Sequence, residues 1–272
     1  MIEIKTVKKG AELVSIKFNG FEKMYDRQDF WNRHSSVLFP IVGKLKNEKT
    51  IINGQTYEIG QHGFAKDMEF EEIGENSYLL KSNEETLKRF PFKFELYISY
   101  EIKKHEVLTK YKVINKDEKI MMFGLGGHMS FLCDYSSGKY RLEFEEIEDE
   151  IEFYQLENEL LKTKSENSKK FLKENRIFLD TKTFENDVII MKNLKSDKVY
   201  LKTETKTIFS FSFKDFPYLA IGSKLDEPFI CISPCFNTAD TIESNGRFEE
   251  KANLIELKPN KEFETEYIIK FF

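Results

Sequence analysis

The sequence contains little cysteine, proline and glycine, and it has no long apolar run. It holds three Cys, six Pro and 13 Gly among 272 residues, against 26 Phe and 12 Tyr. This balance favours β-strands over disorder. No apolar run approaches the ~20 residues that span a bilayer, and residues 1–5 do not resemble a signal peptide. We expect a globular chain that buries a sizeable core and neither spans nor binds a membrane.

An excess of charge of one sign is also lacking. The 42 basic and 47 acidic residues are interspersed and give a net charge of −5, so we expect no basic face for nucleic acid. Three cysteines (Cys133, Cys231 and Cys235) cannot all pair within one chain, and a reducing cytoplasm is the simplest explanation. Because no second Cys or His pair follows Cys231 and Cys235 at zinc spacing, we expect no metal site.

Short alternating segments with turn residues between them run along the chain. The clearest is 50–59, where Asn53 and Gly54 separate two alternating runs and predict a type I′ β-hairpin. Strands are also predicted over 2–7 and 12–18, and a closing strand over 263–271. Many short strands with little helix favour an antiparallel sandwich or barrel, and without an internal repeat or linker we predict one domain over 1–272.

Two other segments are less strand-like. Residues 82–85 fit a capping box of Ser82 with Glu85, which predicts a short helical turn to about Lys88. The acidic region 141–175 has the weakest pattern. Its alternation over 143–153 favours an exposed edge strand kept soluble by charge, and we assign this region no function.

Two of the four histidines stand beside glycine, as His62–Gly63 and Gly127–His128. Glycine removes the steric block to a close approach of backbone and side chain to a ligand. Two such histidines suggest one site built from separate strands. A satisfied structural histidine is the alternative for either residue taken alone.

Five blocks in order, taken together, resemble one family. They are residues 33–47, 61–70, 124–131, 184–190 and 233–240. In sequence and spacing they are similar to the aldose 1-epimerase (galactose mutarotase) family, most closely to its LacX-like branch. The resemblance implies an all-β fold, a large antiparallel β-sandwich (supersandwich) that cradles a free sugar. It also implies interconversion of the α and β anomers of a hexose such as galactose or glucose without a cofactor, by a monomer or homodimer.

The resemblance also implies roles for particular residues. His128 matches the acid that protonates the ring oxygen, a task suited to a histidine near its reference pKa of about 6.5. His62 matches a second histidine that holds or polarises the ring-oxygen region. Lys44 and Lys66 stand where arginine is usual, so they keep the charge without its bidentate fork. Substrate-binding residues expected on this basis are Lys44, Lys66, Arg33, Asp187 and Ser233.

One position departs from the family pattern. The family's base is a glutamate directly before proline, and here that position is Ser233, whose hydroxyl cannot be the resting base without a partner. Losing a general base costs about 10²–10⁴ in rate. Glu243 is the better candidate for a substitute base, ahead of Asp240 in the same loop, and water or a histidine as the base of a slow enzyme is a further alternative. The alternatives are a catalytically weakened or inactive sugar-binding protein, and a hexose-6-phosphate epimerase that uses the cations Arg33, Lys44 and Lys66.

Overall fold

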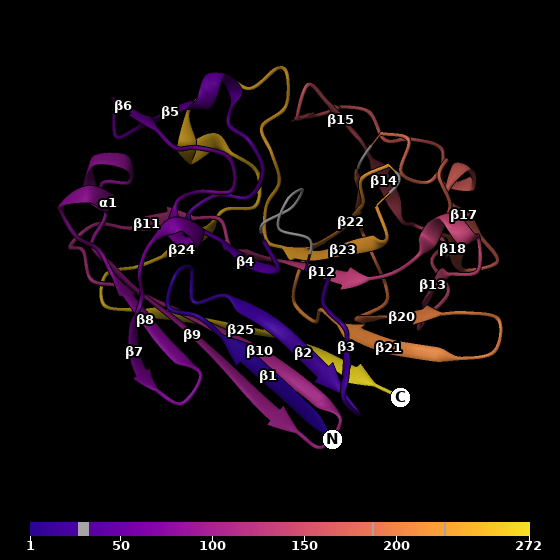
Figure 1. Cartoon of the computed structure of the whole chain (residues 1–272). Helices are drawn as coiled ribbons and strands as arrows, with labels where there is room; N and C mark the ends of the chain where they lie inside the picture. The colour runs from indigo at the N-terminus through magenta and orange to yellow at the C-terminus, as the bar shows by residue number, and fades with distance from the viewer. Residues whose placement is uncertain (27–32, 187, 226) are drawn as a thin grey trace.

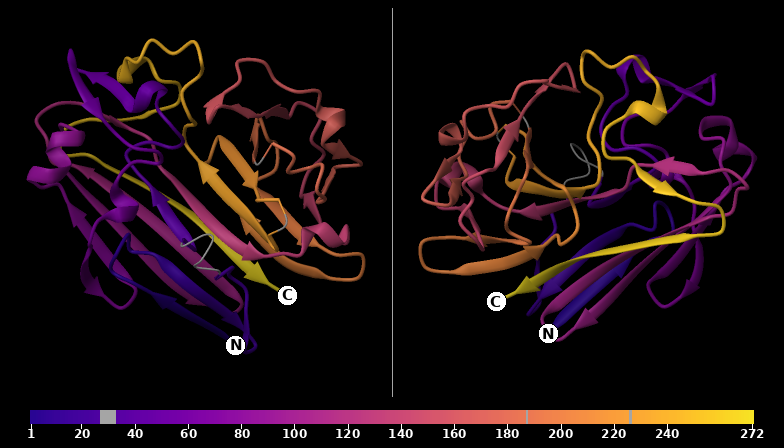
Figure 2. Two further views of the ribbon diagram at one scale, coloured as in Figure 1. Left: turned by 45° about the horizontal axis from the view of Figure 1, so that its top comes forward. Right: turned by 180° about the vertical axis from the view of Figure 1, so that it is seen from behind.

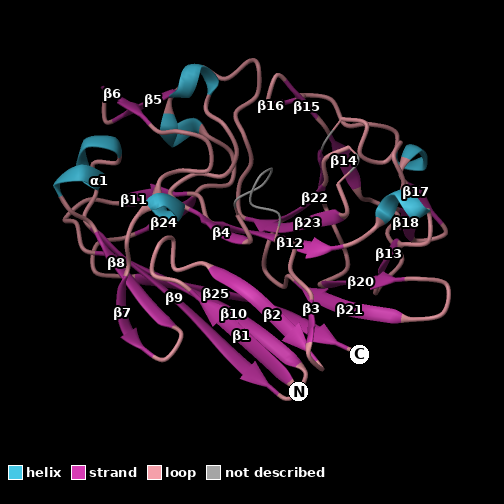
Figure 3. Cartoon of the chain, viewed as in Figure 1, coloured by secondary structure: helices cyan, strands magenta, loops and turns pink. Residues whose placement is uncertain are grey.

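The computed structural model describes residues 1–26, 33–186, 188–225 and 227–272. Strands dominate, and helices are few and short (Figure 3). The described residues contain the α-helix α1 (Glu84–Arg89) and the 3₁₀ helices η1 (Lys46–Glu48), η2 (Ala65–Asp67), η3 (Tyr135–Ser137), η4 (Ser168–Lys170) and η5 (Phe248–Glu250). No helix within these ranges is long and apolar enough to cross a membrane.

The larger sheet has ten antiparallel strands and runs across the lower part of Figure 1. In spatial order they are β17 (Leu172–Lys173), β18 (Arg176–Phe178), β13 (Arg141–Phe144), β20 (Lys198–Lys202), β21 (Thr207–Ser212), β25 (Glu262–Phe271), β10 (Glu106–Asn115), β9 (Phe94–Lys103), β8 (Ser77–Lys81) and β7 (Glu71–Gly74).

The second large sheet has six antiparallel strands and lies above the first in Figure 1. Its order is β14 (Glu152–Tyr154), β19 (Val188–Lys192), β22 (Tyr218–Gly222), β23 (Phe229–Cys235), β12 (Gly126–Leu132) and β4 (Ser35–Leu38). Smaller sheets pair β1 (Ile2–Thr6), β2 (Leu13–Phe18) and β3 (Phe21–Glu22); β5 (Lys49–Ile52) with β6 (Gln55–Glu58); β11 (Met121–Phe123) with β24 (Ile255–Leu257); and β15 (Leu156–Glu157) with β16 (Leu160–Leu161).

An aromatic core joins the two large sheets. Phe131 of β12 packs on Phe209 of β21, with ring centroids 4.5 Å apart, and aromatic pairs at this distance add to the free energy of area burial. Beside them the Tyr100 hydroxyl of β9 donates to the Ala11 carbonyl at 2.7 Å, so the sheet β1–β3 covers the same inner face. Both large sheets are open. The sandwich prediction is therefore confirmed, and the barrel alternative is wrong.

The hairpin prediction is confirmed, whereas the helix cap differs by one residue. Asn53 and Gly54 have φ of 50° and 79° between β5 and β6, as a type I′ turn requires. The N-cap of α1 is Asn83 rather than Ser82, because the Asn83 side chain accepts from the backbone of Thr86, whose hydroxyl accepts from Asn83 N–H in return. Ser82 instead accepts from Phe94 N–H at 3.1 Å.

The prediction of one exposed edge strand over 143–153 is wrong. Its first residues belong to β13, which lies inside the ten-stranded sheet between β18 and β20, and its last two belong to the edge strand β14. The acidic pattern led to a wrong prediction because the Glu143 side chain points away from the core and lies between two cations. Its carboxylate lies 2.7 Å from Lys202 Nζ and 3.2 Å from Arg176 Nε. Leu142 and Phe144 face the core.

A buried ion pair fixes the loop after β23. The Asp240 carboxylate accepts from Lys251 Nζ at 2.7 Å, and both side chains are 6% exposed. Its other oxygen accepts from Lys46 N–H at 3.0 Å. Burial lowers the pKa of the Lys251 ammonium, and the Asp240 carboxylate opposes that shift. The pair thus ties the chain after β4 to the chain after β23.

We expect Asp240→Ala to lower the free energy of unfolding by about 3–5 kcal/mol, because it leaves the Lys251 ammonium buried without its counter-charge. Urea denaturation followed by circular dichroism measures this. The matched control is Glu58→Ala, which breaks the exposed pair of Glu58 with Lys49 and should cost less than about 1 kcal/mol. Equal losses for the two variants would contradict a stabilising role for the buried pair.

Candidate functional site

A cavity of about 550 Å³ opens on the face of the six-stranded sheet that points away from the ten-stranded sheet. Strands β4, β12, β22 and β23 form its floor, and the loop after β23 and the hairpin β15–β16 rise beside it. Both views of Figure 2 place that loop and that hairpin on the same side of the sheet. Polar lining residues include Gln61, His62, His128, Glu159, Ser233 and Thr238, and apolar ones include Leu38, Val42, Ile190 and Tyr218.

His128 reaches the cavity because its neighbour Gly127 lets β12 pack closely on the other side. A Cβ at Gly127 would lie 2.8 Å from Cε1 of Tyr267 in the ten-stranded sheet. Successive residues of a strand point to opposite faces, so Gly127 meets the core while His128 points into the cavity. The close approach that Gly127 permits is to the core, whereas the sequence-based prediction was a close approach to a ligand.

His62 is held by two reciprocal hydrogen bonds to Gly43. Its backbone N–H donates to the Gly43 carbonyl at 2.8 Å, and its ring Nδ1 accepts from Gly43 N–H at 3.0 Å. Because Nδ1 is an acceptor, the neutral ring carries its proton on Nε2. Gly63 follows with φ of 75°, and a Cβ there would lie 2.1 Å from the Phe39 carbonyl oxygen, so only glycine fits.

The two imidazoles share one wall, with ring centroids 5.7 Å apart. Burial, together with smaller contributions from His128 and Lys66, lowers the pKa of His62 to about 3. Burial also lowers the pKa of His128 to about 4. Sequence reasoning took the reference pKa of about 6.5 for His128, and burial of the ring lowers the pKa below that value. Burial therefore favours the neutral form of both rings.

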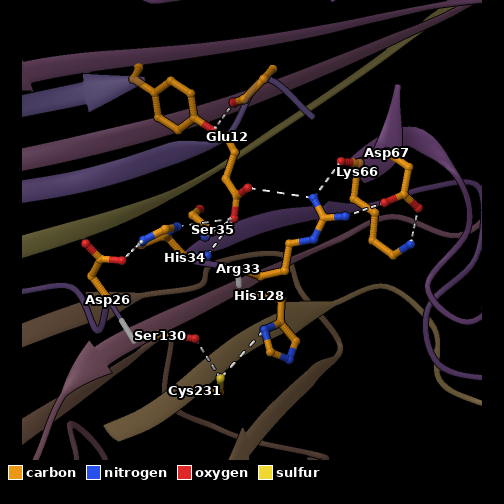
Figure 4. Close-up of polar contacts among 12 residues, drawn as sticks. Glu12, Asp26, Arg33, His34, Ser35, Lys66, Asp67, His128, Ser130 and Cys231 are labelled. Atoms are coloured by element: carbon orange, nitrogen blue, oxygen red, sulfur yellow. Dashed lines mark hydrogen bonds and ion pairs between the residues drawn. The ribbon is translucent and has the colours of Figure 1, made fainter. Parts of the chain in front are cut away.

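Two linked polar contacts lie beside Nδ1 of the His128 ring (Figure 4). Ser130 Oγ lies 3.1 Å from Cys231 Sγ, and that sulfur lies 3.6 Å from His128 Nδ1. Burial raises the pKa of Cys231 to about 12, so the thiol keeps its proton and can donate to Nδ1. That bond favours the tautomer of His128 that carries its proton on Nε2.

The expected cations are placed less centrally than the histidines. Arg33 donates to the Lys66 carbonyl at 3.0 Å, and Arg33 and Lys66 both pair with Asp67 (Figure 4). They therefore hold the segment that carries His62 and do not line the cavity. Lys44 pairs with Glu159 and Glu48.

The other expected residues fall in three different places. Ser233 lines the cavity, 6% exposed, opposite Ala220 of β22. Glu243 is exposed in the loop after β23 and is not among the described residues that line the cavity. Asp187 lies outside the described residues.

Sequence reasoning missed Cys231 and Glu159. Cys231 stands two residues before Ser233 on β23, so strand alternation could have placed both on one face. Glu159 lies in the acidic region that was given no function, and only the tertiary fold brings it to the cavity. Over the described ranges, no group of three or more His, Cys, Asp or Glu side chains is placed to hold a metal ion.

Comparison with known proteins identifies the family. Residues 2–270 match the sequence model of the aldose 1-epimerase family. The chain belongs to this family. It is 31% identical over 278 residues to the plasmid form of protein LacX of Lactococcus lactis subsp. lactis, and the match covers 95% of this chain and 92% of LacX.

Solved structures of the family share the fold. A galactose mutarotase related enzyme from Lactobacillus acidophilus superposes with a TM-score of 0.89 at 30% identity, covering 100% of this chain and 95% of that one. A galactose mutarotase-like protein from Lactobacillus casei gives a TM-score of 0.90 at 25% identity, covering 100% and 97%. Family and fold assign the chain a mutarotase-like function.

The low pKa values of the two site histidines predict an acid-sensitive fold. Between pH 6.5 and about 4, unfolded chains bind protons at histidine that the folded chain does not bind, so stability falls as the pH falls through this window. We expect ¹H–¹⁵N correlation spectra to show His62 and His128 neutral at pH 6, with Nδ1 of His62 unprotonated. The variant His62→Gln/His128→Gln should lose stability less steeply between pH 6.5 and 4. A midpoint near 6.5 for either ring would contradict the prediction.

Proposed function

We propose that the protein is an aldose 1-epimerase that interconverts the α and β anomers of a free hexose, such as galactose or glucose. The observation that carries the proposal is the pair of His62 and His128 on one wall of a cavity of about 550 Å³, in a chain of this family. The names of the two similar structures, both galactose mutarotase relatives, support the choice of sugar.

The reaction needs an acid at the ring oxygen and a base at the anomeric hydroxyl. His128, in its protonated form, gives a proton to the ring oxygen as the bond from C1 to that oxygen breaks. His62, a fixed Nε2–H donor, holds the ring-oxygen region by a hydrogen bond. The anomeric hydroxyl gives its proton to a base and becomes the carbonyl oxygen. Rotation about C1–C2 and closure by the reverse steps deliver the other anomer.

Ser233 cannot be the resting base, because a serine hydroxyl needs a partner to take its proton. Its role in the proposed reaction is to present a hydroxyl beside the sugar. The cations Arg33 and Lys66 act at a distance by fixing the segment of His62. Each of Arg33, Lys44 and Lys66 already has a carboxylate partner, so these three cations do not favour a sugar phosphate over a free sugar.

We also propose that residues 1–272 form one domain and that the protein is cytoplasmic. It needs no cofactor and acts as a monomer or homodimer. Three buried free thiols support a reducing compartment. A second function, sugar binding without turnover, is favoured by Ser233 alone.

The test follows the optical rotation of freshly dissolved α-galactose and α-glucose. We expect the wild type to exceed buffer, and His128→Gln to lose about 10²–10⁴ in kcat. His105→Gln is the control, because His105 is exposed on the hairpin between β9 and β10. If the wild type only equals buffer while Ser233→Glu exceeds it, the enzyme proposal fails and sugar binding without turnover stands.

The pH dependence tests the role of His128 separately. kcat/KM reports the protonation of the free enzyme, and the pKa of His128 is lowered to about 4. If its protonated ring is the acid, kcat/KM should rise as the pH falls from 7 to 5, by up to about tenfold per unit. A plateau that starts near pH 6.5 would contradict this, because it would indicate an ordinary histidine.

A further inference from the structure

One carboxylate reaches the cavity from outside the family's site blocks. Among the described residues that line the cavity, Glu159 is the only one with a carboxylate. Its side chain is 52% exposed. Glu243, the candidate from sequence, does not line the cavity.

The fold holds Glu159 in place at the tip of the hairpin β15–β16. Asn158 and Glu159 form its turn with φ of 52° and 65°, between strand residues Glu157 and Leu160, which pair with each other. At its base, Leu161 N–H donates to the Asp240 carbonyl at 2.8 Å. The tip is therefore fixed relative to the loop after Ser233.

Lys44 makes an ion pair with Glu159. Its Nζ donates to the Glu159 carboxylate, and this hydrogen bond raises the pKa of Lys44. The Lys44 carbonyl accepts from Asp240 N–H at 2.9 Å. The backbone of Asp240 thus connects both members of the pair, and Lys44 orients a carboxylate that would otherwise move with its exposed side chain.

We propose that Glu159 is the general base that Ser233 cannot be. This inference rests on the proposed function. Glu159 takes the proton from the anomeric hydroxyl, the electrons of that O–H bond form the C1 carbonyl, and the electrons of the ring C1–O bond pass to the ring oxygen. That oxygen takes a proton from His128. On closure both protons return. Lys44 is a positioning residue.

The test compares carboxylate-to-amide variants in the polarimetric assay. Glu159→Gln keeps the shape and removes the base, so kcat should fall about 10²–10⁴-fold. Glu157→Gln, on the same hairpin but outside the cavity lining, should match the wild type. Adding Ser233→Glu to Glu159→Gln should restore turnover, because it returns a carboxylate to the family position. Urea denaturation checks that all the variants fold.

Lys44 is tested by charge rescue. Lys44→Met should lower kcat by less than Glu159→Gln does, with little change in KM, and Lys44→Arg should recover most of it. A purely structural role for Lys44 would change the unfolding midpoint without this split between kcat and KM.

The assays distinguish a failure of the Glu159 assignment from a failure of the proposed epimerase activity. If the wild type is active and Glu159→Gln keeps at least half of its kcat, the inference is overturned and the enzyme proposal stands. A fall in Glu243→Gln but not in Glu159→Gln would assign the base to Glu243 instead. A wild type no faster than buffer would overturn both the enzyme and its base.

Discussion

The geometry of the site depends on a buried carboxylate that is not in the cavity. Asp240 makes an ion pair with Lys251 and accepts from Lys46 N–H, while its backbone bonds to Lys44 and Leu161. Three chain segments far apart in sequence are therefore held by one residue. Because a buried charge is stable only when paired and hydrogen-bonded, the loop has little freedom to move, and neither do the cavity walls attached to it.

A second constraint is the partial burial of the two site histidines. Burial favours the neutral form of both rings, and the Gly43 N–H that donates to His62 Nδ1 would oppose a proton there. His62 is thus a hydrogen-bond donor and not a proton carrier. His128 has a thiol, Cys231, beside its Nδ1 in place of a carboxylate. The two histidines are suited to different tasks because the group that contacts Nδ1 differs: it is the Gly43 N–H for His62 and the Cys231 thiol for His128.

The features that could be predicted from the sequence are those that neighbouring residues determine. Asn53–Gly54 specified a hairpin through its need for positive φ, and the pairing of glycine with His62 and His128 located one wall of the cavity. Effects of tertiary structure were missed. The pKa values follow from burial by strands that are distant in sequence. Glu159 lies in a region without a clear sequence pattern, and it is placed at the cavity because β16 bonds to the chain at Asp240.

The acid and the base of this reaction face unequal geometric demands, and this makes a displaced base reasonable. The ring oxygen keeps one position in both anomers, so its proton donor belongs on a rigid strand, as His128 does on β12. The anomeric oxygen points to different sides of the ring in the α and β forms. A base must reach it in both, which suits a half-exposed side chain such as Glu159 on a hairpin tip. Ser233 leaves no carboxylate at this strand position, and in the proposed reaction Glu159 reaches the anomeric oxygen from the hairpin tip instead.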